Sequence, residues 1–185
     1  FLREFVTKPQ QIGAIASSSR ELAQELLADV NWSAVEAVIE YGPGLGAITE
    51  EILRHTHGKD FFVIELNETY ADYFEKRYPQ VPLYRDSVAN VVEIVRNQVL
   101  NAADCIVSGL PWANFSETVQ DELLDATVQV MSPKAHFATY AYIHGLYLKS
   151  GRRFRKKLES RFRTVERSRI IWRNAPPAVV YHCQR

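Results

Sequence analysis

The chain has 185 residues, 46% hydrophobic and 24% charged, a balance typical of one globular domain with a full hydrophobic core. This composition excludes intrinsic disorder, a collagen-like repeat and a small disulfide-stabilised scaffold. No apolar run approaches the roughly 18 to 20 residues that cross a bilayer, and no secretory signal opens the chain, so we expect a soluble intracellular protein. The two cysteines, Cys105 and Cys183, are expected to be free thiols.

Charge is distributed unevenly along the chain, although the formal net charge is zero. Residues 1–133 contain 9 Lys and Arg against 20 Asp and Glu, a balance of −11, whereas residues 134–185 contain 13 against 2, a balance of +11. The basic C-terminal part indicates a polyanionic partner, either nucleic acid or an anionic lipid surface. An ordinary solvated basic face is the alternative.

Short apolar runs alternate with helical patterns over the first three quarters of the chain. The runs show no in-out alternation, which predicts strands covered on both faces, at 37–39, 61–64, 81–84, 105–107 and 137–142. The intervening stretches have helical spacing, at 18–30, 47–55, 68–77, 87–100 and 117–131. Such alternation predicts a parallel α/β sheet with right-handed crossovers.

The pattern changes after the fifth predicted strand. A basic helix is predicted over 146–161, followed by strand-like runs at 164–172 and 178–183. The connection at 173–177 is too short for a crossover helix, which makes the last strand antiparallel. We therefore predict a single α/β domain over 1–185: a Rossmann-like, mostly parallel, seven-stranded sheet with helices on both faces, preceded by N-terminal helices within 1–30.

A glycine-rich loop joins the first predicted strand to the helix that follows it. The sequence from position 40 reads EYGPGLGAIT, with glycines at Gly42, Gly44 and Gly46. Glycines let a ligand approach the backbone closely, and the helix N-terminus presents unpaired N–H groups. Because Gly42, Gly44 and Ala47 also satisfy the dinucleotide fingerprint, the loop alone does not select its ligand.

Three acidic residues stand at the ends of three successive predicted strands: Glu40, Glu65 and Asp86. Glu65 follows the second strand, where a carboxylate accepts hydrogen bonds from both ribose hydroxyls of a nucleoside cofactor. Asp86 follows the third strand, where it would accept from an adenine amino group. Glu40 would repel a pyrophosphate but suits a cationic ammonium group. The structural alternatives are a helix N-cap for Asp86 and solvated strand ends for the glutamates.

With these residues the chain resembles the class I S-adenosylmethionine-dependent methyltransferases, whose first motif reads acid-x-Gly-x-Gly-x-Gly. The resemblance covers residues 36 to about 115. It implies S-adenosylmethionine as cofactor, S-adenosylhomocysteine as product, no metal, and a sheet with an antiparallel seventh strand. The cofactor-binding residues that it implies are Glu40, Gly42, Gly44, Gly46, Glu65, Leu66, Asp86, Ser87 and Ser108.

The fourth predicted strand ends in SGLPWANF at 108–115. Amino-methylating relatives carry an Asn/Asp-Pro-Pro-aromatic or Asn-x-Pro-aromatic loop here, and Ser108 replaces its Asn or Asp. This change removes one acceptor for an exocyclic base amine and disfavours a purine as substrate. Trp112 would instead face a cationic amine through a cation–π contact, worth roughly 0.5 to 2 kcal/mol. A buried core tryptophan is the alternative.

Both flanks of the chain resemble those of bacterial phospholipid N-methyltransferases, in residues 1–19 and in SRIIWRNAPPA at 168–178. The resemblance implies stepwise methylation of phosphatidylethanolamine toward phosphatidylcholine by a monomeric enzyme bound peripherally to the cytoplasmic face of the membrane. Ribosomal RNA adenine N6-dimethyltransferases share the core and are the alternative, although an appended RNA-reading domain is missing. A third hypothesis, an inactive cofactor-binding protein at a membrane surface, conflicts with the intact set of acids.

Two segments are expected to contact an anionic membrane. Phe1, Leu2, Phe5 and Val6 would form an apolar stripe if residues 1–8 are helical, or else this helix would cap the cofactor pocket. The basic helix adds six positive charges, each worth roughly 1 kcal/mol near an anionic leaflet. They are Lys149, Arg152, Arg153, Arg155, Lys156 and Lys157.

The acceptor amine must be neutral when it attacks, so an ammonium group with a pKa near 10 needs a base or relay. The candidates, among which the sequence does not choose, are Tyr41, Tyr140, Tyr142 and His144; core packing explains each tyrosine equally well. Arg173 and Asn174 are candidate ligands of a phosphate headgroup. The predicted catalytic set is Ser108, Trp112 and Tyr41, with Trp112, Tyr140, Tyr142, His144, Arg173 and Asn174 binding the substrate.

Overall fold

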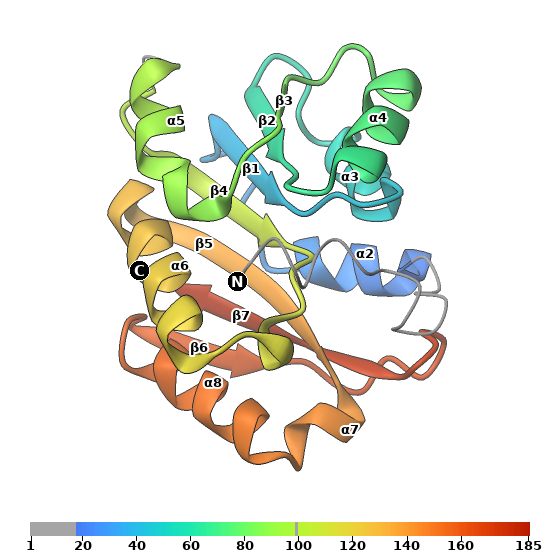
Figure 1. Cartoon of the computed structure of the whole chain (residues 1–185), viewed down its shortest axis with the longest axis vertical. Helices are drawn as coiled ribbons and strands as arrows, with labels where there is room; N and C mark the ends of the chain where they lie inside the picture. The colour runs from blue at the N-terminus through green and yellow to red at the C-terminus, as the bar shows by residue number, and fades with distance from the viewer. Residues whose placement is uncertain (1–17, 99) are drawn as a thin grey trace.

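The computed structural model describes residues 18–98 and 100–185, and it contains a seven-stranded sheet with the strand order β3-β2-β1-β4-β5-β7-β6 (Figure 1). β7 runs antiparallel to β5 and β6, whereas β1 to β5 pair in parallel. The predicted fold class is therefore confirmed. The strands are β1 (Ala37–Tyr41), β2 (Asp60–Ile64), β3 (Leu83–Tyr84), β4 (Ala103–Ser108), β5 (Met131–Tyr142), β6 (Thr164–Arg167) and β7 (Ala178–Gln184).

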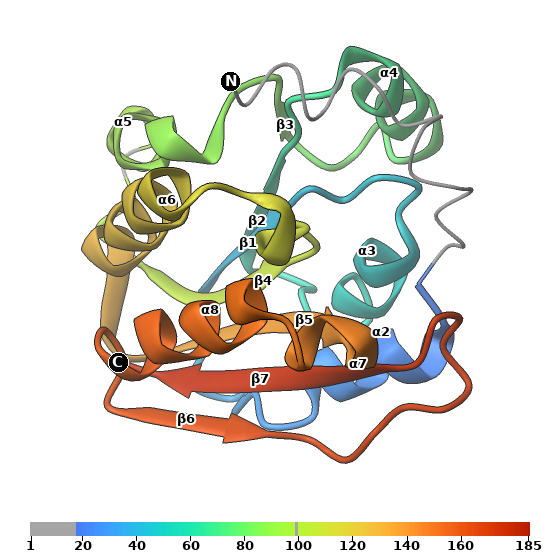
Figure 2. The ribbon, with the colours of Figure 1, turned by 60° about the horizontal axis from the view of Figure 1, so that its bottom comes forward.

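Helices cover both faces of this sheet. The helices α2, α3 and α4 pack on one face, and α5, α6 and α8 pack on the other (Figure 2). Within the described residues, no helix is both long and apolar enough to span a membrane. The helices are α2 (Arg20–Leu27), α3 (Ala47–Ile52), α4 (Glu68–Arg77), α5 (Val91–Asn97), α6 (Glu117–Val130), α7 (Ile143–Leu146) and α8 (Lys149–Glu159), with short 3₁₀ turns η2 (Val88–Asn90) and η3 (Trp112–Asn114).

The central strands explain why the apolar runs in the sequence do not alternate. Every residue of β1 is buried. Its Val38 belongs to the cluster beneath α2 and α3, whereas the next residue, Ile39, belongs to the cluster beneath α5 and α6. Both faces of the strand therefore require apolar side chains. The same burial encloses Cys105 and Cys183, both of which are free.

The prediction of one basic helix over 146–161 is wrong, because two helices, α7 and α8, occupy this region. Leu148 has an extended backbone with φ −74° and ψ 152°, which separates them. The two helices then pack closely: a β-carbon added to Gly151 would lie 2.1 Å from the carbonyl oxygen of Gly145. The predicted strand at 164–172 is also shorter, since β6 ends at Arg167.

The two oppositely charged parts of the sequence meet between α6 and α8. Arg153 pairs with Glu117 of α6 at 3.0 Å, and Lys157 pairs with Asp121. Arg161, just beyond α8, contacts both Asp121 and Asp125 at 2.9 and 2.7 Å. These ion pairs at the protein surface neutralise part of the basic charge from which the sequence predicted a polyanionic partner.

The close contact between α7 and α8 predicts opposite effects of two glycine-to-alanine changes. We expect Gly151→Ala to destabilise the protein by about 1 to 3 kcal/mol, because the new methyl group meets backbone atoms that cannot rotate away. We expect Gly145→Ala, whose β-carbon meets nothing within 4 Å, to be neutral or stabilising by up to about 1 kcal/mol. Urea unfolding of both variants checks this, and equal effects would contradict the described packing.

Candidate functional site

The glycine loop after β1 has left-handed backbone conformations at Gly42, Gly44 and Gly46, with φ of 64°, 54° and 85°. A side chain at position 46 would also collide with Tyr78, since a β-carbon there would lie 2.3 Å from the ring. The Tyr78 hydroxyl donates a hydrogen bond to the carbonyl of Gly46 at 3.1 Å. The loop is therefore fixed from one side by Tyr78, at the end of α4.

Glu40 is fully buried as the second-last residue of β1, two positions before Gly42 of the glycine loop. Its Oε2 accepts a hydrogen bond from the Thr49 hydroxyl of α3 at 2.7 Å, whereas Oε1 has no hydrogen-bond partner among the described residues. Burial raises the pKa of this carboxyl group from 4.5 to about 8; the bond from Thr49 opposes this change, and the nearby Glu65 adds to it. A buried carboxylate oxygen without a partner favours a cationic, hydrogen-bond-donating ligand.

Glu65 is held at the end of β2 by backbone N–H groups. Its Oε1 accepts from the N–H of Asn67 at 2.8 Å, and its Oε2 accepts from the N–H of Gly44 at 3.3 Å. Burial raises the pKa of this carboxyl group, and these backbone hydrogen bonds oppose the rise. The carboxylate is thus fixed against the glycine loop, and each oxygen keeps acceptor capacity for a hydroxyl group.

Asp86 follows β3 and is partly exposed. It accepts hydrogen bonds from the N–H of Ser87 at 2.6 Å and from the side-chain amide of Asn90 at 2.8 Å. Ser87, rather than Asp86, is the N-cap of η2, because its hydroxyl accepts from the N–H of Ala89. The N-cap alternative for Asp86 is therefore wrong. Leu66, another predicted cofactor-binding residue, follows Glu65 and is partly exposed.

These groups match the polar features of S-adenosylmethionine. The partnerless oxygen of Glu40 suits the cationic ammonium group, and the fixed carboxylate of Glu65 suits the ribose hydroxyls. Gly44 has open space where a β-carbon would stand, so a ligand can approach the backbone there. The described residues therefore fit the cofactor that the resemblance implies.

Ser108 and Trp112 form one internal unit at the end of β4. The Ser108 hydroxyl accepts hydrogen bonds from the indole N–H of Trp112 at 3.0 Å and from the N–H of Leu110 at 3.3 Å. Trp112 is 2% exposed and stacks on Phe154 of α8, with ring centroids 5.1 Å apart. The prediction that Trp112 faces the substrate amine is therefore corrected, because Phe154 covers the ring face and burial of a large apolar ring is favourable.

Tyr41 also belongs to the core. It is fully buried beneath α6, where its hydroxyl accepts a hydrogen bond from Thr127 at 3.5 Å. Burial raises the pKa of this hydroxyl far above its ordinary value. Tyr41 is therefore not a base for the reaction, because a phenol with no exposed surface, whose ionised form is disfavoured by burial, cannot collect a proton from a ligand.

Tyr140, Tyr142 and His144 form an aromatic row at the carboxyl end of β5. The rings of Tyr140 and Tyr142 meet edge to face at 5.6 Å, and Tyr142 stacks on His144 at 5.7 Å. Both tyrosines are partly buried beside the cluster of α2, whereas His144 is exposed. The structure therefore brings together three of the residues predicted to bind the substrate, and the last of them reaches solvent.

Arg173 and Asn174, in the connection between β6 and β7, have different roles. Asn174 is 3% exposed, accepts from the N–H of Ser19 at 2.9 Å and donates to the carbonyl of Pro176 at 2.7 Å. Its prediction as a headgroup ligand is corrected, because both ends of its amide are used to fix the start of α2. Arg173 is exposed and pairs with Glu21 of α2 at 3.2 Å.

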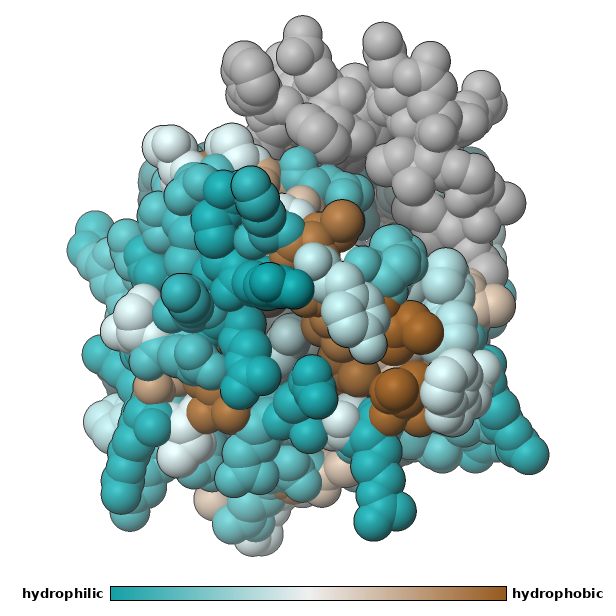
Figure 3. All heavy atoms as spheres, turned by 90° about the horizontal axis from the view of Figure 1, so that it is seen from below, coloured by the Kyte–Doolittle hydropathy of each residue, from teal (hydrophilic) through white to brown (hydrophobic). Residues whose placement is uncertain are grey.

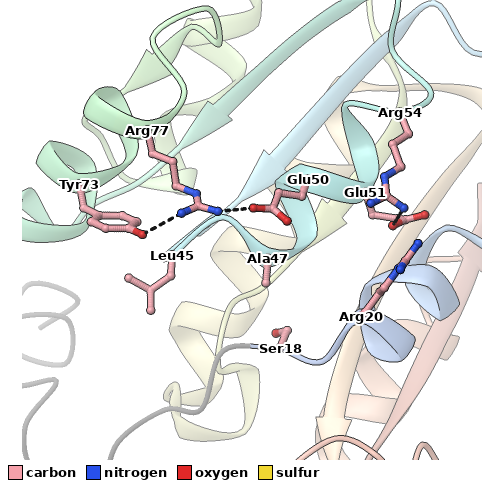
Figure 4. Close-up of a pocket in the computed structure, with 9 residues that line it drawn as sticks. All are labelled: Ser18, Arg20, Leu45, Ala47, Glu50, Glu51, Arg54, Tyr73 and Arg77. Atoms are coloured by element: carbon pink, nitrogen blue, oxygen red, sulfur yellow. Dashed lines mark hydrogen bonds and ion pairs between the residues drawn. The ribbon is translucent and has the colours of Figure 1, made fainter.

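A cavity of about 380 Å³ lies beside Leu45 of the glycine loop, between α2, α3 and α4 (Figure 4). Most of its charged groups are paired with each other: Arg77 points toward Glu50 and Tyr73, and Arg54 contacts Glu51 at 2.9 Å. The strand-end acids and Ser108 do not line it. This cavity is therefore distinct from the predicted cofactor site. It is lined by Ser18, Arg20, Leu45, Ala47, Glu50, Glu51, Arg54, Tyr73 and Arg77.

Three residues that shape the site were not predicted. Thr49 binds Glu40, Asn67 binds Glu65, and Tyr78 fixes the glycine loop. Asn67 had a local signal, because it stands directly before a helical pattern and is the N-cap of α4. Tyr78 had none, since it reaches Gly46 only through the packing of α4 beside the loop.

No family model matches this chain, but comparison with known proteins identifies relatives. The chain is 27% identical over 188 residues to the ornithine lipid N-methyltransferase of Singulisphaera acidiphila, covering 100% of this chain and 94% of that protein. It is 26% identical over 131 residues to the ribosomal RNA small subunit methyltransferase A of Borreliella burgdorferi, which covers 63% of this chain and 46% of that protein.

Solved methyltransferase structures share the fold. The N-methyltransferase NodS from Bradyrhizobium japonicum superposes with a TM-score of 0.71 at 17% identity, covering 90% of this chain and 95% of that one. The same enzyme in complex with S-adenosyl-l-homocysteine superposes with a TM-score of 0.70. These findings confirm the class I methyltransferase fold, and the full-length similarity confirms the resemblance to lipid N-methyltransferases.

The buried carboxyl group of Glu40 predicts a pH-dependent stability. A carboxyl pKa of about 8 in the folded protein, against 4.5 unfolded, gives a contribution that is fully present below pH 4.5 and is lost as pH rises through about 8. Glu40→Gln, which stays neutral, should remove this loss. Urea unfolding at pH 5, 6.5 and 8.5 without cofactor should show the variant gaining stability relative to wild type as pH rises. Parallel pH profiles would contradict a buried, protonated Glu40.

The position of Glu65 predicts a loss of cofactor affinity on substitution. Glu65→Ala should weaken S-adenosylmethionine binding by about 1.5 to 3 kcal/mol, the range for hydrogen bonds to a charged group. Glu93→Ala, an exposed carboxylate on α5, is the matched control and should bind like wild type. Calorimetry measures both, with NAD as a competing ligand. Tighter binding of NAD than of S-adenosylmethionine would reject the cofactor assignment.

Proposed function

We propose that the chain methylates the amine of a membrane-lipid headgroup. S-adenosylmethionine is the methyl donor, in keeping with the class I fold and with the fit of Glu40 and Glu65 to its ammonium and ribose groups. The observation that carries the lipid acceptor is the similarity to a lipid N-methyltransferase over 100% of this chain. The similarity to a ribosomal RNA methyltransferase covers 63%.

The acceptor shared by the candidate lipids is a primary or partly methylated amine. Phosphatidylethanolamine, methylated stepwise toward phosphatidylcholine, is the acceptor that we propose from the flanking segments of the chain. The relative from Singulisphaera acidiphila is named for ornithine lipid instead. Ser108 supports either lipid over an adenine base, because its hydroxyl is engaged with Trp112 and Leu110 where base-methylating relatives carry an Asn or Asp.

Bound S-adenosylmethionine would supply a methyl group together with its leaving group, because the sulfonium sulfur keeps the electrons of the broken S–C bond. The protein must therefore mainly align the amine and exclude water. We assign this alignment to the aromatic row of Tyr140, Tyr142 and His144. Burial raises the pKa of Tyr140, so its phenol stays neutral and offers a ring face to the ammonium. Exposed His144 can accept the amine proton and release it to solvent.

Arg173 is the proposed ligand of the phosphate or carboxylate in the lipid headgroup. Its side chain is 83% exposed, and its partner Glu21 is 44% exposed, so the ion pair is accessible to a competing phosphate or carboxylate. A guanidinium group binds either anion through two parallel hydrogen bonds. Its location in the connection before β7, next to the end of β5, places it on the same edge of the sheet as the aromatic row.

The function is tested by transfer of a radiolabelled methyl group to three acceptors in parallel: phosphatidylethanolamine vesicles, ornithine-lipid vesicles and ribosomal RNA. We expect transfer to lipid amines, and the two vesicle types identify the preferred headgroup. Transfer to RNA without transfer to lipid would overturn the proposal in favour of the ribosomal alternative. Binding of S-adenosylmethionine without transfer to any acceptor would support an inactive cofactor-binding protein.

The proposed proton relay predicts a selective effect of one histidine. His144→Gln should lower the turnover of lipid by roughly 10²-fold, the lower end of the range for general-base catalysis, while leaving S-adenosylmethionine affinity unchanged. His57→Gln, an exposed histidine after α3, is the matched control and should retain full turnover. Steady-state kinetics and calorimetry separate the two effects. Unchanged turnover in His144→Gln would remove this residue from the reaction.

A further inference from the structure

Four large apolar side chains are strongly exposed in two segments near the end of β5. Tyr147 and Leu148, at the junction of α7 and α8, are 77% and 54% exposed. Ile170 and Trp172, in the connection between β6 and β7, are 40% and 69% exposed. Solvent-exposed tryptophan, tyrosine, leucine and isoleucine gathered in this way mark an interaction surface.

The two segments leave the sheet at the same corner. The N–H of Ile143, the first residue of α7, donates a hydrogen bond to the carbonyl of Pro177 at 3.0 Å. Tyr142 pairs with Ala178 across the β5–β7 ladder, and Ile171 bridges to the same Ala178. From below, Figure 3 shows apolar surface exposed among hydrophilic side chains on this side of the molecule.

Basic side chains without an ion-pair partner adjoin these apolar groups. On α8, one side is buried through Gly151, Phe154 and Leu158, and Arg153 and Lys157 pair with acids of α6. A different side of the helix carries Lys149, Arg152 and Lys156, which have no ion pair within residues 18–98 and 100–185. The helical spacing of three and four residues places these three cations on one face. In the connection after β6, Arg169 is likewise exposed and unpaired within the described ranges.

We propose that Tyr147, Leu148, Ile170 and Trp172, with Lys149, Arg152 and Arg169, form a docking surface for the face of an anionic lipid bilayer. The proposal rests on the proposed function only in that a lipid substrate lies in a bilayer. Tyrosine and tryptophan suit the boundary between headgroups and acyl chains, and lysine and arginine beside them are attracted to anionic lipids.

This surface also brings a headgroup near the site. Tyr147 lies three residues beyond His144, the exposed end of the aromatic row, and Trp172 directly precedes Arg173. A bilayer bound to the docking surface would therefore meet the edge of the sheet at which the amine must enter. The predicted apolar stripe of Phe1, Leu2, Phe5 and Val6 lies outside the described residues, and the docking surface does not depend on it.

Vesicles that contain phosphatidylglycerol and phosphatidylcholine, and no amine acceptor, test docking separately from methylation. Lys149→Gln/Arg152→Gln should lower the partition constant roughly 25-fold, since each cation near an anionic leaflet contributes about fivefold. Lys76→Gln/Arg96→Gln, which removes two charges from α4 and α5, is the matched control and should bind like wild type. Trp172→Ala should also lower the partition constant, because an exposed aromatic ring is lost from the docking surface.

Two further measurements decide what occupies the surface. Methyl transfer to a lipid amine in detergent micelles should be retained by Trp172→Ala and by Lys149→Gln/Arg152→Gln, because no bilayer has to be bound. If both variants bind vesicles as strongly as wild type does, the docking surface is overturned. If the wild-type protein transfers no methyl group in micelles, the proposed function alone is overturned. If wild type does not bind vesicles but binds RNA, and the same variants abolish RNA binding, the partner is nucleic acid and the proposal is rejected.

Discussion

Burial of both faces of the sheet is the constraint that organises this protein. Helices cover β1 completely, and every one of its residues is excluded from solvent. Polar side chains that act on a ligand can therefore emerge only where strands end. Parallel strands bring their carboxyl ends to one edge, which is why Glu40, Glu65 and Asp86, far apart in sequence, lie at the ends of three adjacent strands.

The same burial determines the electrostatics of that edge. Glu40 has lost its hydration but gains a single hydrogen bond from Thr49, so its charged form is unfavourable until a cationic ligand arrives. Glu65 is buried too, yet two backbone N–H groups compensate its charge. One carboxylate is thus suited to a cation and the other to neutral hydroxyl groups, and a pyrophosphate is disfavoured at both.

The distribution of basic residues gains its meaning only in three dimensions. The sequence shows a surplus of 11 positive charges after residue 133. In the fold, Arg153, Lys157 and Arg161 face acids of α6, so a part of this surplus stabilises the packing of α8 instead of attracting a partner. The unpaired cations lie on another side of the helix, beside exposed apolar groups, and the proposed docking surface rests on this combination.

The sequence by itself determined the order of the strands, the antiparallel last strand and the positions of the three acids at strand ends, because apolar runs, glycines and carboxylates after them are local signals. It did not decide between the two interpretations of Trp112, since an aromatic ring after a strand suits either a ligand or the core. The tertiary structure decided it by stacking Phe154, 42 positions away, on the ring. The tertiary structure likewise shows that Tyr41 and Asn174 are structural residues, because their hydrogen bonds with Thr127 and Ser19 form only when distant segments pack together. Contacts between distant segments, which no local pattern encodes, therefore separate the residues that bind a ligand from those that hold the fold.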